Sequence, residues 1–294
     1  MRFEKGELMR KQNEVLLRLI AVLISGFLAA AASSAFAASS GWYTAENSRF
    51  RLISASGVPN TKKDNRVAGV EIQLADGWKT YWRTPGDGLA TEIGMTASEN
   101  VAEAKLLWPA PERIEGAGGV TSYGYANSVV LPILLQATDP ASPILLRAEI
   151  IYGVCADICI PVEGEAELTI PVEDDSEYAA ALANAMGKVP YKQADGVYCS
   201  HRFTGARLST GEDGPLLLIE TAHDAQASGR DLFVERENGL ALPPAELNAQ
   251  AAAGQSVYAV SLESEEMAAS IRTEQLILTM TSDQGSCETS LRME

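Results

Sequence analysis

Two cysteines, Cys155 and Cys159, have the residue type and the spacing that could do chemistry in this chain of 294 residues. Three residues separate them, and a tight turn could bring their Cα atoms within the roughly 4.4–6.8 Å that a disulfide requires. In the loop-entropy model, closing a loop of about five residues stabilises a fold by only about 2 kcal/mol. Such a weak cross-link predicts a disulfide that opens and closes, and its chemistry would be thiol–disulfide exchange.

The other two cysteines are Cys199 and Cys287, and four cysteines allow three pairings. Proximity favours a bond between Cys155 and Cys159. A bond between Cys199 and Cys287 would close a loop of roughly 90 residues, which the same model values at about 4.6 kcal/mol. Because these two flank the C-terminal part of the chain, we interpret them as a structural clasp. The alternative that both pairs are structural stays open at this point.

Neither a metal ion nor an organic cofactor is expected. Two thiolates are too few for a closed zinc site, and the two histidines, His201 and His223, lie elsewhere in the sequence. Copper(I), which soft thiolates bind, is the metal alternative. Direct exchange between thiols and disulfides needs no cofactor.

The charges around the pair bear on its reactivity. No Lys, Arg or His lies within five residues of either cysteine, and Asp157 sits between them. A nearby carboxylate disfavours the thiolate, so the local sequence predicts an ordinary or raised thiol pKa, with Asp157 as the modulating residue. This prediction fits a reductant or relay that depends on docking with a partner, because strong oxidants have an acidified nucleophile.

The N-terminus predicts export. An apolar stretch over residues 15–32 follows several basic residues and precedes Ala35, Phe36 and Ala37. This pattern is typical of a secretory signal peptide over residues 1–37, cleaved near Ala37, with an uncleaved membrane anchor as the alternative. No later segment has the ~20 consecutive apolar residues of a spanning helix, so we expect no membrane span in the mature chain. An exported chain meets an oxidising compartment, where disulfides are the default.

The net charge excludes one class of partner. The formal charge is −16, and without residues 1–37 the chain would carry 18 basic and 36 acidic residues, or −18. Such a chain repels phosphate backbones, so nucleic-acid binding is not expected.

Short apolar runs between turn residues dominate the remaining sequence. They are rich in Val, Ile and Leu, and Gly, Pro, Asn and Asp separate them, which predicts an all-β sandwich or barrel. The expected strands include residues 67–74, 129–136, 144–152, 166–170, 215–221, 256–262 and 275–281.

One stretch predicts a helix. Acidic residues at 174–177 suit a helix N-terminus, Gly187 suits the C-terminal cap, and Pro190 follows. We therefore expect a β domain over residues 38–173, a helical linker over 174–189, and a second β-rich domain over 190–294. The Ala- and Gln-rich residues 245–254 predict a loop or short helix.

Residues 45–172 resemble the N-terminal periplasmic domain of the DsbD family of thiol–disulfide interchange proteins, closest to the branch related to copper-tolerance ScsB proteins. Four stretches in order carry the resemblance. They are residues 77–88 (GWKTYWRTPGDG), 108–111 (WPAP), 123–132 (YGYANSVVLP) and 152–161 (YGVCADICIP).

The resemblance implies an immunoglobulin-like β-sandwich with a redox dithiol. Cys159 would be the attacking thiol and Cys155 the resolving thiol. Family members receive electrons from a partner and pass them to oxidised periplasmic proteins. Here the electron donor would be a separate membrane or thioredoxin-like protein, because the chain continues into neither kind of domain.

The resemblance also implies an aromatic cap loop that shields the pair until a partner docks. The matching segment is residues 119–127, where Ser122 replaces the family's cap phenylalanine. Tyr123 or Tyr125 would then shield the pair, with ordinary packing on a β surface as the alternative. The residues Trp78, Tyr81, Trp82 and Trp108 are expected to pack in the core and loops.

Two alternatives to a redox relay stay open. One is a non-catalytic binding module, in which each of two β-sandwiches is stapled by a disulfide and recognises a protein partner. The other is a copper-handling protein.

Overall fold

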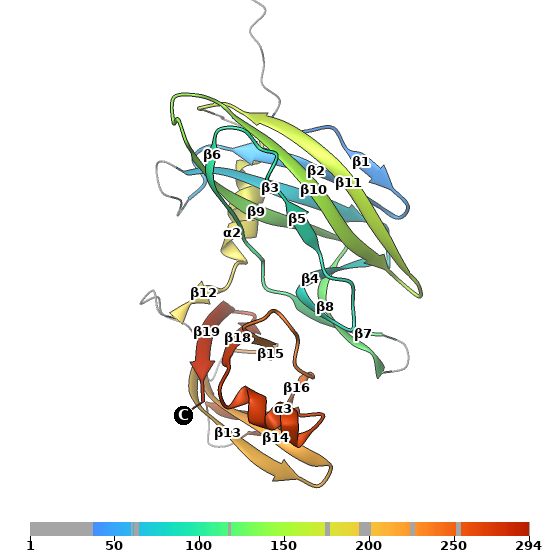
Figure 1. The fold of residues 1–294 in the computed structure, drawn as a ribbon, viewed down its shortest axis with the longest axis vertical. Helices are drawn as coiled ribbons and strands as arrows, with labels where there is room; N and C mark the ends of the chain where they lie inside the picture. The colour runs from blue at the N-terminus through green and yellow to red at the C-terminus, as the bar shows by residue number, and fades with distance from the viewer. Residues whose placement is uncertain are drawn as a thin grey trace, which may run out of the picture. The chain divides into compact units, whose positions relative to one another are not determined.

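Two β-sheets form the part of the chain that precedes residue 171 (Figure 1). The computed structural model describes residues 38–59, 61, 65–116, 119–173, 177–193, 201–223, 227–250 and 254–293. The strands of this first part are β1 (Tyr43–Ala45), β2 (Ser48–Ala55), β3 (Asn65–Leu74), β4 (Lys79–Gly86), β5 (Glu92–Gly94), β6 (Val101–Leu106), β7 (Glu112–Glu115), β8 (Thr121–Ala126), β9 (Ser128–Ala137), β10 (Ile144–Cys155) and β11 (Cys159–Ile170). The sheet orders are β1-β2-β3-β9-β6 and β11-β10-β4-β8-β7, with β5 paired to β10.

Alternation of apolar residues explains why these strands form two layers. Successive side chains of a strand point to opposite faces, so one face can enter the core. In β10 the buried apolar side chains on the core face are Ile144, Leu146, Ala148, Ile150, Tyr152 and Val154. They meet residues of the other sheet, where Phe50 packs edge-on against Tyr152 with ring centroids 5.9 Å apart. The predicted all-β, immunoglobulin-like class is confirmed.

The longest hairpin joins β10 to β11. Both strands have 12 residues, and their antiparallel pairing runs without a shift from Ile144↔Ile170 to Cys155↔Cys159. Figure 1 shows these two strands side by side along the whole length of the sheet. The hairpin therefore carries the two cysteines at its closed end.

Two further sheets form the second part of the chain. Their orders are β12-β19-β18-β15 and β13-β14-β17-β16. The short helix α3 (Glu265–Ile271) begins after Ser264, whose side chain accepts a hydrogen bond from the N–H of Met267. The strand bounds are β12 (Tyr191–Lys192), β13 (His201–Gly211), β14 (Gly214–His223), β15 (Asp231–Arg236), β16 (Ala245–Gln250), β17 (Gln255–Ser261), β18 (Gln275–Ser282) and β19 (Gly285–Arg292).

One sequence-based expectation in this second part is wrong. Residues 245–250 form strand β16 rather than a loop or helix. They pair with β17, from Ala245↔Val260 to Gln250↔Ser256, across one irregularity in register. Pairing with an existing strand edge thus outweighs the high helix propensity of Ala and Gln.

The expected linker helix exists, but it is a packed element. Helix α2 spans Ala179–Gly187, has no acidic residue in its first turn, and is followed by Lys188 in the C-cap position. Gly187 is therefore the last helical residue and not the cap. Leu182 is fully buried against Ile53 and Val67. A Cβ placed on Gly69 would lie 2.9 Å from a methyl group of Leu182, so the helix approaches β3 where a side chain is missing.

Apolar contacts join the two parts of the chain. Phe233 of β15 is 1% exposed and belongs to the hydrophobic core of the first sandwich. Its ring meets Trp82 and Tyr123 edge-on, with centroid distances of 5.9 and 5.0 Å. A residue of the second part thus completes the core of the first.

Charged contacts surround this apolar contact. Arg83 donates to Glu235 at 3.0 and 2.6 Å and to Glu288 at 2.6 Å. Arg113 donates to both carboxylate oxygens of Asp231, at 2.9 and 2.7 Å. Because Glu235 is only 3% exposed, its pairing with Arg83 compensates a carboxylate that would otherwise be buried alone.

The division of the chain into domains stays a prediction. Residues 37–294 form one compact unit that contains both β parts, so the proposed boundaries at 173 and 190 fall within it. The predicted signal peptide, residues 1–37, lies outside the described residues. Among the described residues, no helix is long and apolar enough to cross a membrane.

Phe233 belongs to the second part of the chain, but replacing it by Ala is expected to destabilise the first sandwich, whose core it completes. All four tryptophans, which are Trp42, Trp78, Trp82 and Trp108, lie in the first sandwich and report its unfolding by fluorescence. The cavity should cost about 3–5 kcal/mol, measured by urea denaturation. The control is Leu247→Ala, whose side chain is 49% exposed and which should leave the transition unchanged. An unchanged tryptophan transition in Phe233→Ala would contradict the shared core.

Candidate functional site

The closed end of the β10–β11 hairpin holds the cysteine pair. Cys155 ends β10, Cys159 begins β11, and the two form a disulfide with a Cα–Cα distance of 4.2 Å. Between them the N–H of Ala156 donates to the carbonyl oxygen of Ile158 at 3.0 Å, which tightens the turn. The strand pairing therefore holds the two Cα atoms together, slightly closer than the roughly 4.4–6.8 Å that is usual for a disulfide.

The two sulfur-bearing residues differ in exposure. Cys155 is 0% exposed, whereas Cys159 lies on the surface. The loop residues around them are open to solvent, including Asp157 and Ile158, which is 65% exposed. An incoming thiol or disulfide can therefore reach the residue Cys159 directly, while Cys155 is covered.

Tyr81 contacts the exposed cysteine. Its hydroxyl oxygen lies 3.3 Å from Sγ of Cys159, and it is the donor because a disulfide sulfur carries no hydrogen. Burial raises the pKa of the Tyr81 phenol above its ordinary value, so the donor stays protonated at neutral pH. When the pair is reduced, the same O–H can donate to a thiolate at Cys159 and stabilise it.

Two glycines make room for the Tyr81 ring. A Cβ on Gly88 would lie 2.3 Å from a ring carbon, and a Cβ on Gly153 would lie 3.0 Å from the ring. Gly153 stands two residues before Cys155 and hence on the same face of β10. The ring of Tyr81 therefore lies over this face, beside the disulfide.

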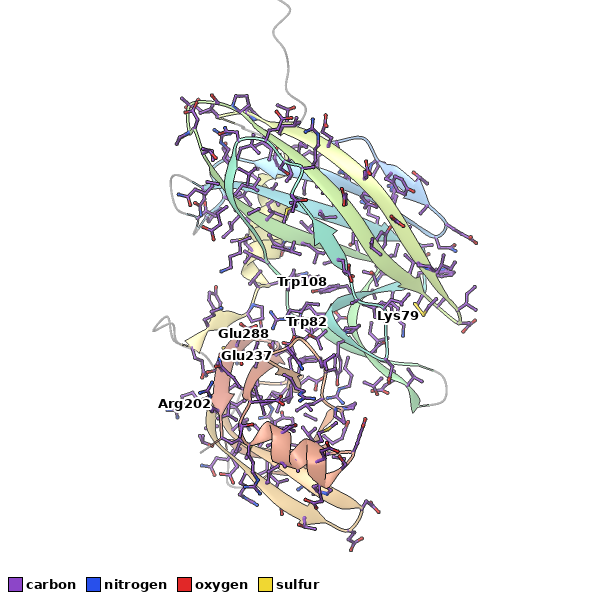
Figure 2. The ribbon with its side chains drawn as sticks, viewed as in Figure 1. Lys79, Trp82, Trp108, Arg202, Glu237 and Glu288 are labelled. Atoms are coloured by element: carbon purple, nitrogen blue, oxygen red, sulfur yellow. A yellow bond between two sulfur atoms is a disulfide. The ribbon has the colours of Figure 1, made fainter. Side chains whose placement is uncertain are left out.

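Lys79 brings a positive charge to the pair from the neighbouring strand. It is the cross-strand partner of Cys155, and its ammonium donates to the hydroxyl of Ser122 at 3.1 Å. Figure 2 shows Lys79 near the end of the hairpin that carries the disulfide. A cation on the neighbouring strand favours a thiolate, which adds an influence that the local sequence did not contain. The ordinary or raised thiol pKa expected from the local sequence stays a prediction.

Tyr123 and Tyr125 lie on the opposite face of the sheet. Residues 121–126 form strand β8, in which Gly124 pairs with Tyr81 and Tyr125 pairs with Thr80. The Tyr125 hydroxyl donates to the carbonyl of Pro109 at 2.8 Å, and Tyr123 meets Phe233. Burial raises the pKa of Tyr123 to about 12 and that of Tyr125 above its ordinary value. The geometry thus favours the packing alternative for both, and we assign the contact with the disulfide to Tyr81.

The remaining predicted site residues are separate from the pair. Cys287 in β19 is disulfide-bonded and 4% exposed. Cys199 lies outside the described residues, so its pairing with Cys287 stays a prediction. Among the described residues, no group of three or more His, Cys, Asp and Glu side chains is placed to hold a metal ion.

Sequence reasoning missed both polar neighbours of the pair. Lys79 and Tyr81 are far from the cysteines in sequence, and the aromatic-rich stretch around them was interpreted as packing. Their alternation is the signal that could have found them, because positions 79 and 81 share one face of a strand. What the sequence did not supply was the pairing of this strand with β10.

The fold and the site define an immunoglobulin-like β-sandwich domain that carries an accessible disulfide at the end of a hairpin. Residues 51–171 match the family model described as thiol:disulfide interchange protein DsbD, N-terminal. This match over part of the chain agrees with the resemblance predicted from the sequence. Among curated proteins, no sequence matches the chain.

A solved structure extends the likeness beyond this segment. The N-terminal periplasmic domain of ScsB from Proteus mirabilis matches with a TM-score of 0.65 and 22% sequence identity. The match covers 87% of this chain and 98% of the ScsB chain, so it reaches into the second β part. At this identity the likeness shows a shared fold.

Replacing Tyr81 by Phe should raise the pKa of the Cys159 thiol. The change keeps the ring and removes the O–H that would donate to the thiolate, a bond worth on the order of one pKa unit at an exposed site. The measurement is the pH dependence of iodoacetamide alkylation in a Cys155→Ala background, which isolates Cys159. Tyr125→Phe, which removes a hydroxyl on the other face, is the matched control and should leave that pKa unchanged. Equal thiol pKa values with and without the Tyr81→Phe change would show that the hydroxyl does not stabilise the thiolate.

Proposed function

We propose that this chain is a periplasmic thiol–disulfide exchange protein that relays electrons through the Cys155–Cys159 dithiol. The observation that carries the proposal is the asymmetry of the pair, with an exposed Cys159 and a fully buried Cys155 at the end of one hairpin. A cross-link of such a short loop adds little stability, so a structural role explains it poorly.

The proposed reaction is direct exchange in two steps. The Cys159 thiolate attacks one sulfur of a partner disulfide, forming a mixed disulfide and releasing the partner's other sulfur as a thiolate. The Cys155 thiolate then attacks Sγ of Cys159, which closes the Cys155–Cys159 disulfide and frees the partner's second thiolate. Two electrons pass to the partner, and the two protons of the dithiol end on its thiols.

Three neighbouring side chains affect the stability of the two thiolates in this proposal. Tyr81 donates a hydrogen bond to the Cys159 thiolate, and the Lys79 ammonium favours the thiolate of Cys155 across the strand pair. Asp157, exposed in the loop between the cysteines, opposes both effects because it is an anion. The balance of these charges would tune the pair for exchange with a docked partner.

Similarity supports a proposal for the compartment and the partners. The ScsB structure is described as an N-terminal periplasmic domain, and residues 1–37 have the pattern of a signal peptide. We propose that a separate membrane or thioredoxin-like protein reduces the pair and that oxidised periplasmic proteins reoxidise it.

The reduction potential of the pair tests its redox role. Exchange with partners requires a potential above about −300 mV, because inert structural disulfides lie below that value. Equilibration with glutathione and dithiothreitol buffers of graded potential, followed by alkylation of free thiols, measures it. A value well below this limit would mean that the Cys155–Cys159 disulfide is structural and would contradict the proposed exchange function.

The order of attack can be tested with 5,5′-dithiobis(2-nitrobenzoate). The reduced wild-type pair should release two thionitrobenzoate ions for each dithiol, whereas Cys155→Ala should release one and keep the other as a mixed disulfide. The matched variant Cys159→Ala leaves only the buried Cys155, which should react at least about tenfold more slowly. Equal rates for the two single variants would contradict the assignment of Cys159 as the attacking thiol.

A further inference from the structure

We propose that the sheet face around the disulfide docks a partner whose reactive sulfur is surrounded first by apolar residues and then by Lys and Arg. This inference rests on the proposed exchange function and adds the chemistry of the partner's surface. It is based on the pairing of β10 with β11 and β5, because each set of paired residues shows which side chains lie next to the cysteines on this face.

The pairing register defines the rows of this face. Paired residues share a face, so the row after Cys155 and Cys159 holds Gly153 and Pro161. The next row holds Ile151, with Glu163 on one side and Glu92 on the other. The row beyond it holds Glu149 and Glu165, opposite Gly94.

Exposed apolar side chains lie beside the disulfide, together with the exposed Asp157 of the loop. Ile158 in the loop is 65% exposed, and Leu89 and Ile151 are each 42% exposed. Leu89 lies above the same row as the Tyr81 ring, because a Cβ on Gly153 would come within 2.8 Å of the Leu89 Cβ. These residues form an apolar centre around Cys159, the accessible cysteine of the pair, which is the arrangement of a docking interface with a polar rim.

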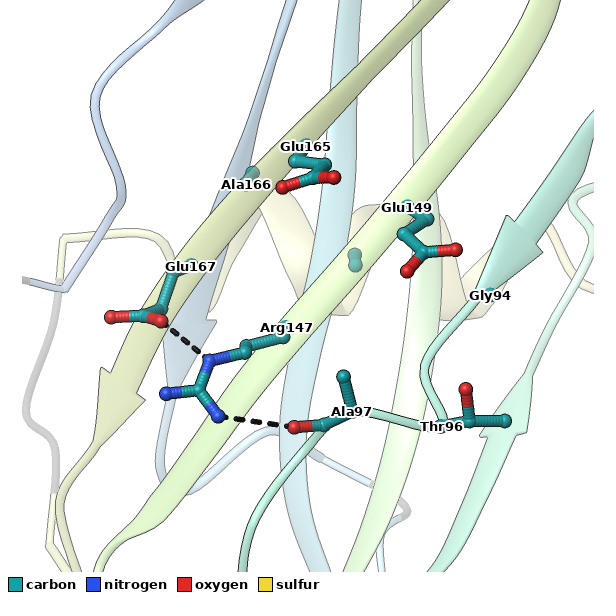
Figure 3. Close-up of a pocket in the computed structure, with 9 residues that line it drawn as sticks. Gly94, Thr96, Ala97, Arg147, Glu149, Glu165, Ala166 and Glu167 are labelled. Carbon is teal, nitrogen blue, oxygen red and sulfur yellow. Dashed lines mark hydrogen bonds and ion pairs between the residues drawn. The ribbon is translucent and has the colours of Figure 1, made fainter.

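Carboxylates that have no Lys or Arg partner among the described residues form the rim. Glu92, Glu149, Glu163 and Glu165 are exposed, and none makes a side-chain ion pair with another described residue. Farther along the strands, Arg147 pairs with Glu167 at 2.6 Å and with Glu99 at 2.8 Å. Arg147, Glu149, Glu165 and Glu167 line a pocket of about 360 Å³ on this face. Figure 3 shows Arg147 joined to Glu167, whereas no dashed line joins Glu149 or Glu165 to another residue drawn there.

The four carboxylates of this rim outnumber the ammonium of Lys79 beside the pair, so the charge of the face favours a basic occupant. Glu163 stands four residues beyond Cys159, or about 13 Å along an extended strand, which is within the range of charge interactions at low ionic strength. An acidic partner, including a second copy of this chain with its net charge of −16, would place like charges against the rim. A basic rim on the partner would instead gain attraction and a faster encounter.

Three matched peptide disulfides test the proposal. They are homodimers of an acetylated and amidated pentapeptide with a central Cys, flanked on both sides by two Lys, two Ser or two Glu. The reduced protein is mixed with each at 10 mM and at 500 mM ionic strength, and closure of the Cys155–Cys159 disulfide is followed by tryptophan fluorescence or alkylation. The test variant is Glu92→Lys/Glu163→Lys, and the control is Glu212→Lys/Asp213→Lys at an exposed turn of the second part.

The comparison of protein variants removes intrinsic differences between the peptides. At 10 mM ionic strength the rate ratio of Lys to Glu peptide should fall on the order of tenfold in Glu92→Lys/Glu163→Lys, and this change should disappear at 500 mM. The control variant should keep the wild-type ratio, and the Ser peptide should react equally with all three proteins.

Two failures are distinguishable. If the Ser peptide does not oxidise the pair, the exchange function itself is wrong. If the Ser peptide reacts but the charge ratio is the same in the test and control variants, the exchange function survives and the basic docking partner is wrong.

Discussion

The uninterrupted register of the β10–β11 hairpin is the constraint on which the candidate site depends. Twelve residues on each strand pair in order, and the last pair is Cys155 with Cys159. A slip by one residue would turn every side chain of one strand to the other face. The buried apolar face of β10 prevents such a slip, since it would place Ile150 and Tyr152 in solvent. The core thus holds the two sulfurs together from the opposite face of the hairpin.

Strand β4 links the site to the second part of the chain. Tyr81 faces the disulfide, and its neighbour Trp82 faces Phe233 on the other side of the sheet. Arg83 and Thr84, the next two residues, both donate to Glu235. Contacts with the second part therefore fix the strand that supplies the hydroxyl group at Cys159. The second β part thus supports the position of β4 in the first part.

Much of the fold could be predicted from apolar runs. Strands such as β3, β9, β14 and β18 are rich in Val, Ile and Leu, and the expected segments fall within or close to the observed ones. Strand β4 was not predicted because its polar and aromatic residues end in Pro85 and Gly86, which indicate a turn. Strand β16 was not predicted because Ala and Gln favour a helix when no neighbouring strand is considered. Both strands depend on partners that are distant in sequence.

The candidate site was also predicted only where local sequence determines it. The cysteine pair followed from its spacing, and the family resemblance led to the correct fold. Tyr81 and Lys79 depend on the pairing of β4 with β10 and β8, which local sequence does not encode. The two tyrosines expected to shield the pair instead face the core because of the alternation in β8. Assigning them correctly required the face of each strand, which follows from the sheet and not from the motif.

The burial of Cys155 has a consequence for the kinetics of the proposed relay. Because Cys159 is the accessible cysteine of the pair, the electron donor and the electron acceptor must use the same sulfur and the same surrounding face. They cannot be bound together, so turnover would follow a ping-pong scheme in which each partner competes with the other at high concentration. Donor and acceptor, however different in fold, would then have to present a common surface around their own reactive sulfur.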